Sequence, residues 1–326
     1  MSIKAKLPGI SIAVITGLAA LFLSKHYDAP AMLFALLLGI AMSFLYQEGP
    51  CKDGIEFASN FVLRVGVSLL GLRLAFNDLI GLGWETIAAL LIAIITTILL
   101  GISLSRKLGF SKSFGALTGG SVAICGASAA MAITAILPEH KNKERDTLLT
   151  VIGVTSMSTI AMVAYPILAT YLGLDDTQSG LFLGGTIHDV AQVVGAGYSV
   201  SEQTGDISTL VKLVRVSMLM PVVIVMLFFI KRYSDTNNKQ TNTAKVPFFL
   251  VAFVVLMVIN SCFNLPESVI NPSISFSRFA LVTAIAAIGM KSNFAQLKCV
   301  GFKPIILMLI ETIWIAAFIL AVISFS

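Results

Sequence analysis

Charge is scarce in this sequence. Aspartate, glutamate, lysine and arginine supply 12% of its 326 residues, while hydrophobic residues supply 57%. Soluble domains carry about 25% charged residues, so the composition excludes water as the main solvent of the chain and indicates a lipid bilayer. Histidine is scarcer still, with three residues, of which His26 and His140 fall in expected loops. A histidine-rich metal centre inside the membrane is therefore excluded.

Cysteine is also rare, and the spacing of the cysteines indicates neither a metal site nor a set of disulfides. Cys51, Cys125, Cys262 and Cys299 show no C-x-x-C pattern, so neither a disulfide framework nor a zinc site is expected. Small buried hydrophobic positions are the simpler explanation for them. A basic stripe interleaved with aromatic residues is missing too. The net charge of +5 therefore reports membrane orientation rather than a nucleic-acid partner.

What the sequence has in abundance is apolar segments of about 20 residues, the length that crosses a bilayer. They leave almost nothing for a soluble domain, so we expect one all-α polytopic membrane domain over 1–326 with about 9–11 membrane segments. The first segment could pass for a signal peptide, but ten similar segments follow it. The segments lie near 7–24, 30–46, 57–76, 84–104, 114–137, 147–172, 178–200, 208–231, 246–263, 273–291 and 302–325.

The loops set the expected orientation. Lysine and arginine concentrate on the cytoplasmic side, so Lys4 and Lys6 predict a cytoplasmic N-terminus. One loop, "PEHKNKERD" (138–146), would face outside despite its three basic residues if every segment crossed. Two arrangements remain open. Either this mixed-charge loop is an exception and eleven segments cross, or 114–137 and 178–200 are re-entrant and nine cross.

Those two segments share a glycine pattern. "GALTGGSVAICGAS" (115–128) and "GLFLGGTIHDVAQV" (180–193) align at an offset of 65. A second match, at an offset of 218, pairs "LLGLRLAFNDLIGLGW" (69–84) with "AIGMKSNFAQLKCVGF" (287–302). Its members are expected to run in opposite directions through the membrane. Inverted repeats are typical of secondary transporters with a midplane site, and chance similarity of apolar stretches is the alternative.

The glycine pairs suggest interrupted helices. Irregular backbone at membrane depth costs several kcal/mol per unpaired group unless it is buried in protein or lines a wet cavity. Gly119-Gly120 before Ser121, and Gly184-Gly185 before Thr186, are therefore expected to interrupt two helices at a site. A half-helix that begins there directs its positive dipole end at the cavity and favours an anion. Close helix packing through small residues is the alternative.

An ionisable pair follows the second glycine pair. An aspartate at the midplane costs about 2.5–3.5 kcal/mol on insertion scales, and His188 beside Asp189 adds a group that titrates near neutral pH. Asp189 and Gln192, three residues apart, share a helix face. A structural ion pair remains the alternative explanation of Asp189.

The other charges within candidate spans leave a positive surplus. They are Arg64, Lys212, Arg215, Arg278 and Glu311, and together with Asp189 they favour a negatively charged guest. Lys212 and Arg278 lie near the predicted span ends and are expected to reach the interface. Arg64 and Arg215 lie deeper.

"LTGGSVAICGASAAMAI" followed by "FLGGTIHDVAQVVGAGYSVS" resembles the YeiH-type bacterial inner-membrane proteins of the UPF0324 family, also labelled as sulfate exporters. The resemblance covers nearly the whole chain and implies a place in the bacterial inner membrane. It also implies kinship with cation:proton antiporters and bile-acid symporters, which have a mobile core with two interrupted helices, a scaffold, a dimeric assembly and elevator-like transport. One departure is that "IGMKSNF" comes next to last here, so that group's sodium sites are not carried over.

Together these features predict a secondary active transporter of a small inorganic or organic anion such as sulfate, sulfite or a sulfonate. It is not expected to be an enzyme, to bind nucleic acid or to hold a cofactor beyond H⁺ or Na⁺ as coupling ion, and it is expected to form a homodimer. Residues 105–231 would form the central part of the substrate-carrying core, and the remaining spans the scaffold and the rest of the core. The alternatives are a cation:proton antiporter that uses Asp189 and an intramembrane enzyme that uses His188 and Asp189.

The predicted site has three parts. Asp189 or His188 is the candidate for ion or proton coupling, and Arg64 and Arg215 are the candidates for charge compensation. The predicted anion-binding residues are Gly119, Gly120, Ser121, Cys125, Gly126, Ala127, Ser128, Gly184, Gly185, Thr186, His188 and Gln192.

Overall fold

The computed structural model describes residues 3–27, 30–47, 49–73, 80–138, 142–233, 248–263, 265–292 and 300–325. These residues form helices and their connections, with no strand among them. Six helical segments are long and apolar enough to cross a membrane. The predicted all-α polytopic fold is therefore confirmed. The six segments are Ala5–Tyr27, Gly83–Lys107, Lys143–Tyr171, Glu202–Ile230, Glu267–Lys291 and Phe302–Phe325.

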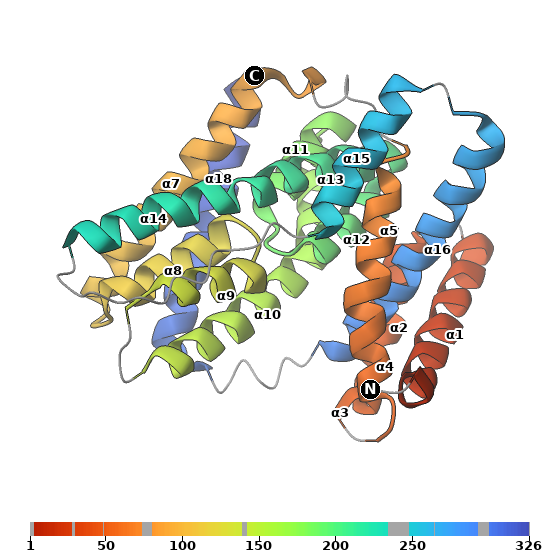
Figure 1. Cartoon of the computed structure of the whole chain (residues 1–326), viewed down its shortest axis with the longest axis horizontal. Coiled ribbons are helices and arrows are strands. Elements are labelled where there is room, and N and C mark those ends of the chain that lie inside the picture. The colour runs from red at the N-terminus through yellow and green to blue at the C-terminus, as the bar shows by residue number, and fades with distance from the viewer. Residues whose placement is uncertain are drawn as a thin grey trace.

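The helices gather into two bundles that lie side by side (Figure 1). Helix α12 connects them by packing on α2 and α16. The small bundle contains α1 (Ile3–Tyr27), α2 (Ala31–Ala41), α3 (Phe44–Gln47), α4 (Lys52–Phe57), the π-helical turn η1 (Ala58–Val62), α5 (Leu63–Leu70), α15 (Phe248–Cys262) and α16 (Glu267–Lys291). The large bundle contains α7 (Gly83–Lys107), α8 (Lys112–Ala123), α9 (Ala127–Ile136), α10 (Lys143–Tyr171), α11 (Asp176–Thr186), α12 (Val190–Val200), α13 (Glu202–Ser217), α14 (Leu219–Tyr233) and α18 (Phe302–Phe325).

Small residues set the packing of the small bundle. A Cβ atom at Gly39 of α2 would meet the carbonyl oxygen of Ala286 and the Cα atom of Gly289 in α16. Gly9 of α1 and Gly54 of α4 approach each other in the same way. Because lipid gives apolar helices no hydrophobic reason to associate, such close backbone contact is a main source of their attraction.

Helices α8 and α9 form a hairpin. The side chain of Ser111 caps the start of α8 by accepting a hydrogen bond from the amide of Phe114 at 3.1 Å. The backbone breaks at 124–126, where Gly126 has a φ of 64°. The chain then turns back and brings α9 against α8. A Cβ at Gly120 of α8 would therefore meet the side chain of Ile133 in α9. We call this unit hairpin 1; its two helices lie beside each other in Figure 1.

Helices α11 and α12 form hairpin 2. A capping box of Asp175 and Gln178 starts α11, and the helix ends before the extended residues 187–189. The two ends of the hairpin meet, because Ser201 and Thr204 donate hydrogen bonds of 2.6 Å and 2.8 Å to Asp176 Oδ1. These bonds to its charged form lower the pKa of the Asp176 carboxyl.

The two tips lie beside the middle of α10. Val154 of this 29-residue helix lies next to Gly126 in hairpin 1, and Ser158 accepts a hydrogen bond from the amide of Asp189 in hairpin 2. A helix of this length spans about 43 Å, so its middle lies at mid-membrane depth. The face with Lys107, Lys112 and Lys143 is called the first face, and the face with Tyr171 and Asp176 the second face.

This geometry follows the re-entrant arrangement for segments 114–137 and 178–200. Each hairpin returns to the face from which it enters, hairpin 1 from the first face and hairpin 2 from the second. The start of α10 at Lys143, within the stretch 138–146 that has three basic residues, therefore lies on the same face as Lys107 and Lys112. Of the second repeat pair, 74–79 and 293–299 lie outside the described residues. The helices that lead into the two stretches, α5 and α16, run antiparallel, because Ser277 bonds Gly66 while Ala58 before α5 packs with Met290.

Candidate functional site

Two cations on α13 join the hairpin tips. Lys212 donates hydrogen bonds to the carbonyl oxygens of Ile124 in hairpin 1 and Ile187 in hairpin 2, at 2.7 Å and 2.8 Å. Its side chain is fully buried. One ammonium group therefore donates to carbonyls at the ends of both interrupted helices, where carbonyls have no partner within the helix.

Arg215, one helical turn after Lys212, also donates hydrogen bonds to both tips. We call Lys212 and Arg215 together the clamp. Its guanidinium donates to the carbonyls of Val122 and Ala123 at 3.2 Å and 2.6 Å, and to those of Gly184 and Ile187 at 3.0 Å and 3.2 Å. A planar group with five donors suits this set of diverging acceptors. The two cations also lie at the negative dipole ends of α8 and α11. Their charges therefore hold the tips together.

A cavity of about 410 Å³ lies on the other side of the tips, between the two bundles. The starts of α9 and α12 face it, so the positive dipole ends of both half-helices point toward the cavity. Its lining from the large bundle includes Cys125, Ala127, Ser128, Thr155, Asp189 and Gln192. The lining from the small bundle includes Tyr46, Ser59, Asn60, Arg64, Lys291 and Ser292.

The two half-helices do not present the same group to the cavity. The Asp189 side chain caps its own helix, α12, by accepting a hydrogen bond from the Ala191 amide at 3.2 Å. The N-cap residue of α9 is Gly126, which has no side chain to cap the helix. The start of α12 therefore carries a carboxylate of its own, whereas the start of α9 offers backbone amides beside Ala127 and Ser128.

Hydroxyl residues of α10 fix the tip of hairpin 2. Ser158 Oγ accepts from the amide of Asp189 at 3.0 Å and donates to Gln192 Oε1 at 3.3 Å. Gln192 Nε2 also donates to Thr159 Oγ1 at 3.5 Å. The orientation of Asp189 and Gln192 toward the cavity is therefore set by α10.

The small bundle supplies two cations to the cavity. Arg64 is the second residue of α5, just after the π-helical turn at Ala58–Val62, and Ser59 and Asn60 of that turn also line the cavity. An extra residue in a helical turn rotates the side chains that follow, and such turns are common at functional sites. Lys291, the last residue of α16, lies on the same lining. With Asp189 as the one lining carboxylate among the described residues, the cavity has a positive balance.

His188 and Glu311 both lie in the packed interior of the large bundle. His188 Nε2 and Thr312 Oγ1 of α18 are 3.0 Å apart, and neither residue lines the cavity. Thr118 of α8 donates to Glu311 Oε1 at 2.8 Å, and Glu311 Oε2 has no hydrogen-bond partner among the described residues. Helix α18 thus contacts the tip of hairpin 2 through Thr312, and helix α8 of hairpin 1 through Glu311.

The glycine pairs lie inside α8 and α11, and the helices continue past them. Gly119 packs against Thr97 and Ile98 of α7, and Gly184 against Ser208 of α13. The breaks come at 124–126 and 187–189, where the chain turns back toward its own face. The expectation that the helices stop at the glycine pairs is therefore corrected: these pairs permit close packing, and the turns lie after them, at 124–126 and 187–189.

The structure divides the predicted site residues into two groups. Those that line the cavity are Arg64, Cys125, Ala127, Ser128, Asp189 and Gln192. Those that lie behind the tips or within the hairpins are Gly119, Gly120, Ser121, Gly126, Gly184, Gly185, Thr186, His188 and Arg215. Ser121 and Thr186 each donate to the carbonyl four residues earlier in their own helix.

Two residues of the site, Lys212 and Lys291, are not among the site residues that the sequence predicts. The sequence places Lys212 near a span end, but α13 starts at the second face and reaches mid-membrane depth near residue 212. The available signal is its spacing from Arg215, which places both cations on one helix face. Lys291 also ends a span, yet it faces the cavity because the large bundle lies against that end of α16. Among the described residues, no group of three or more His, Cys, Asp and Glu could hold a metal.

The chain matches the family model described as Conserved hypothetical protein 698 over residues 8–308. It is 50% identical to the UPF0324 membrane protein CT0845 of Chlorobaculum tepidum, over 96% of this chain and 88% of that protein. It is 46% identical to the UPF0324 membrane protein TauZ of Paracoccus denitrificans, over 97% and 94% of the two chains. It is 31% identical to the UPF0324 inner membrane protein YeiH of Escherichia coli K12, over 95% and 91%. No solved structure matches the chain at a significant level.

Proposed function

Because the chain belongs to the UPF0324 family of membrane proteins, we propose that it is a secondary active transporter of a small anion. One observation carries the proposal. Two re-entrant hairpins meet at mid-membrane depth, and the starts of α9 and α12 face a cavity of about 410 Å³ that also contains Arg64 and Lys291. Helix starts and cations in a low-dielectric cavity stabilise negative charge.

The anion would bind nearest to α9. The N-cap residue of α9 is a glycine and not a carboxylate, and Arg64 reaches the cavity from the small bundle. A guanidinium favours the planar array of oxygens that a carboxylate, sulfonate or sulfate presents. Small oxyanions of this class, sulfate, sulfite and sulfonates among them, are the proposed substrates.

Asp189 is the proposed coupling residue. Its carboxylate lines the same cavity as the anion and occupies the start of α12. Two negative groups in one cavity repel each other, so anion binding would favour a proton or a sodium ion at Asp189. His188 would affect coupling only by positioning the tip of hairpin 2, because its side chain points toward Thr312.

Alternating access would come from movement of the large bundle against the small one. Substrate-binding elements of both hairpins belong to the large bundle, and the cavity lies at its junction with the small bundle. This division supports an elevator-type mechanism in the bacterial inner membrane, with the first face in the cytoplasm. A cation:proton antiporter that uses Asp189 is the second candidate, since the cavity contains this carboxylate.

Two experiments on purified protein separate these functions. First, thermal unfolding is measured with sulfate, sulfite and small sulfonates against chloride, because a ligand that binds only the folded state raises its apparent stability. Second, flux of the stabilising anion and of sodium is measured separately in proteoliposomes. Anion uptake supports the proposal. Sodium or proton exchange without anion movement would replace it with the antiporter.

A further inference from the structure

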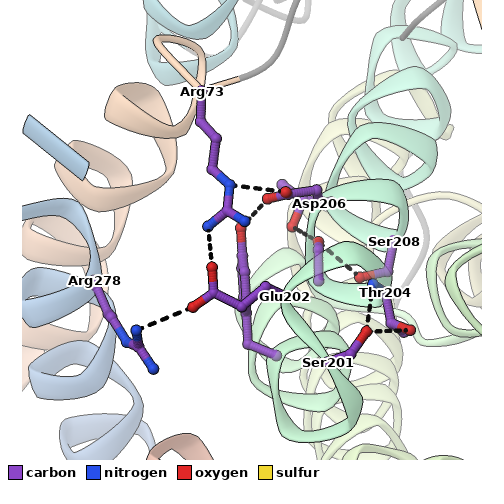
Figure 2. A network of polar contacts seen from close by, with 10 residues as sticks. Arg73, Ser201, Glu202, Thr204, Asp206, Ser208 and Arg278 are labelled. Atoms are coloured by element: carbon purple, nitrogen blue, oxygen red, sulfur yellow. Dashed lines mark hydrogen bonds and ion pairs between the residues drawn. The ribbon is translucent and has the colours of Figure 1, made fainter. Parts of the chain in front are cut away.

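An ion-pair network connects the two bundles near the second face (Figure 2). Arg73, just after α5, contacts Glu202 at 2.7 Å and Asp206 at 2.8 Å. Arg278 of α16 contacts the other oxygen of Glu202 at 3.0 Å. Both arginines belong to the small bundle and both carboxylates to the first turns of α13.

The carboxylates are rigidly tied to hairpin 2. Tyr198 of α12 donates to Asp206 Oδ1 at 2.6 Å. Ser201, directly before Glu202, donates to Asp176 at the start of α11. A shift of hairpin 2 relative to α5 and α16 therefore moves Glu202 and Asp206 away from the two arginines.

Along α5, the Arg73 end of the network lies further toward the second face than the cavity does. The lining of the cavity includes Arg64 and Val67 of α5 and reaches Lys291 and Ser292 at the first face. Arg73 lies further along the chain toward the second face, and none of the four charged residues lines the cavity. The ion pairs of Arg73 with Glu202 and Asp206 therefore stand between the cavity and the second face.

We propose that Arg73, Arg278, Glu202 and Asp206 form a latch that closes the second-face end of the cavity and must open for the large bundle to move. The latch rests on the proposed transport function. Its chemistry suits reversible closure, because Glu202 and Arg278 have side chains 53% and 61% exposed and exposed ion pairs are individually weak. Four charges in a network hold the closed state, and salt screens them.

Native Cys125 reports on the latch, because it lines the cavity. The test starts from a protein in which Cys51, Cys262 and Cys299 are replaced by serine. A membrane-impermeant thiol reagent is added from one side at a time in proteoliposomes of known orientation, and the rate of Cys125 modification is measured. The latch is broken in one variant by Glu202→Gln with Asp206→Asn, and in a milder variant by Arg73→Gln. Glu267→Gln, an exposed carboxylate in the first turn of α16, is the matched control.

We expect the broken latch to raise modification from the second face about tenfold, the change that loss of roughly 1.4 kcal/mol from the closed state produces. The control leaves the rate unchanged, and 1 M KCl raises the rate in the starting protein but not in the Glu202→Gln, Asp206→Asn variant. Equal second-face rates in all proteins overturn the latch, even if anion transport is present. Faster second-face labelling in protein that transports no anion retains the latch and removes the proposed function. Gel filtration of each variant confirms that the rates come from folded protein.

Discussion

At the scale of single residues, Lys212 stabilises the meeting of the hairpin tips. Lys212→Met leaves the buried carbonyl of Ile124 without the Lys212 hydrogen bond and leaves that of Ile187 with Arg215 alone, and an unsatisfied buried acceptor costs about 1–3 kcal/mol. We therefore expect a clear fall in the thermal unfolding temperature in detergent. Lys303→Met, an exposed lysine near the start of α18, is the control. Equal unfolding temperatures for the two variants would show that the clamp contributes no stability.

The cavity cations should determine anion affinity. Arg64→Gln and Lys291→Gln each remove one positive charge from the lining. A hydrogen bond to a charged group is worth about 1.5–3 kcal/mol, so each change should weaken anion binding roughly ten- to hundredfold. The measurement is the anion concentration that gives half-maximal thermal stabilisation. Arg106→Gln at the exposed end of α7 should not alter it, and an unchanged value in all three variants would exclude an anion beside these cations.

Asp189 should control coupling. Asp189→Asn keeps an oxygen that can accept from the Ala191 amide but removes the titratable group, so anion uptake should no longer respond to a pH gradient. Uptake driven by the anion gradient alone should persist. The measurement is isotope flux in proteoliposomes with and without the pH gradient. If the variant still responds as the unchanged protein does, Asp189 is not the proton carrier.

Some of these residues could be found from the sequence alone, for a physical reason. An aspartate or arginine inside an apolar segment is costly, so Asp189 and Arg64 are conspicuous. Lys212 and Lys291 are less so, because a lysine near a span end is ordinarily explained by its long side chain reaching water. Their roles depend on how helices from distant parts of the chain pack, and no local pattern contains that information.

At the scale of elements, Gly126 sets the turn of hairpin 1. Its φ of 64° disfavours a side chain, and a Cβ there would lie 3.2 Å from Val154 Cγ1. Gly126→Ala should cost about 1–2 kcal/mol from the backbone alone, with more from the contact, and should weaken anion-dependent stabilisation by shifting the start of α9. Gly173→Ala is the matched control, because Gly173 has a φ of 68° and no atom within 4 Å. Its thermal stability should fall less, with the anion response intact.

The hairpins also show how much of the structure the glycine pattern predicts. The paired motifs predict interruptions in two segments, and the structure has both. Their exact sites differ because glycine serves two purposes in membrane helices: it permits a break and it permits close contact. Gly184 has the second role against Ser208. The turn at Ile187 and Asp189 contains no glycine, so composition could not identify it.

At the scale of the whole molecule, both tips converge because the hairpins enter from opposite faces. This arrangement makes a prediction about sidedness. In a protein without its four native cysteines, Lys112→Cys and Glu144→Cys flank hairpin 1, while Thr177→Cys and Gln203→Cys flank hairpin 2; all four positions are exposed. An impermeant thiol reagent should label the first two from one side and the last two from the other. Full crossing by 114–137 would instead put Lys112 and Glu144 on opposite sides. That result would separate the two tips from mid-membrane depth and remove the basis for a shared anion cavity.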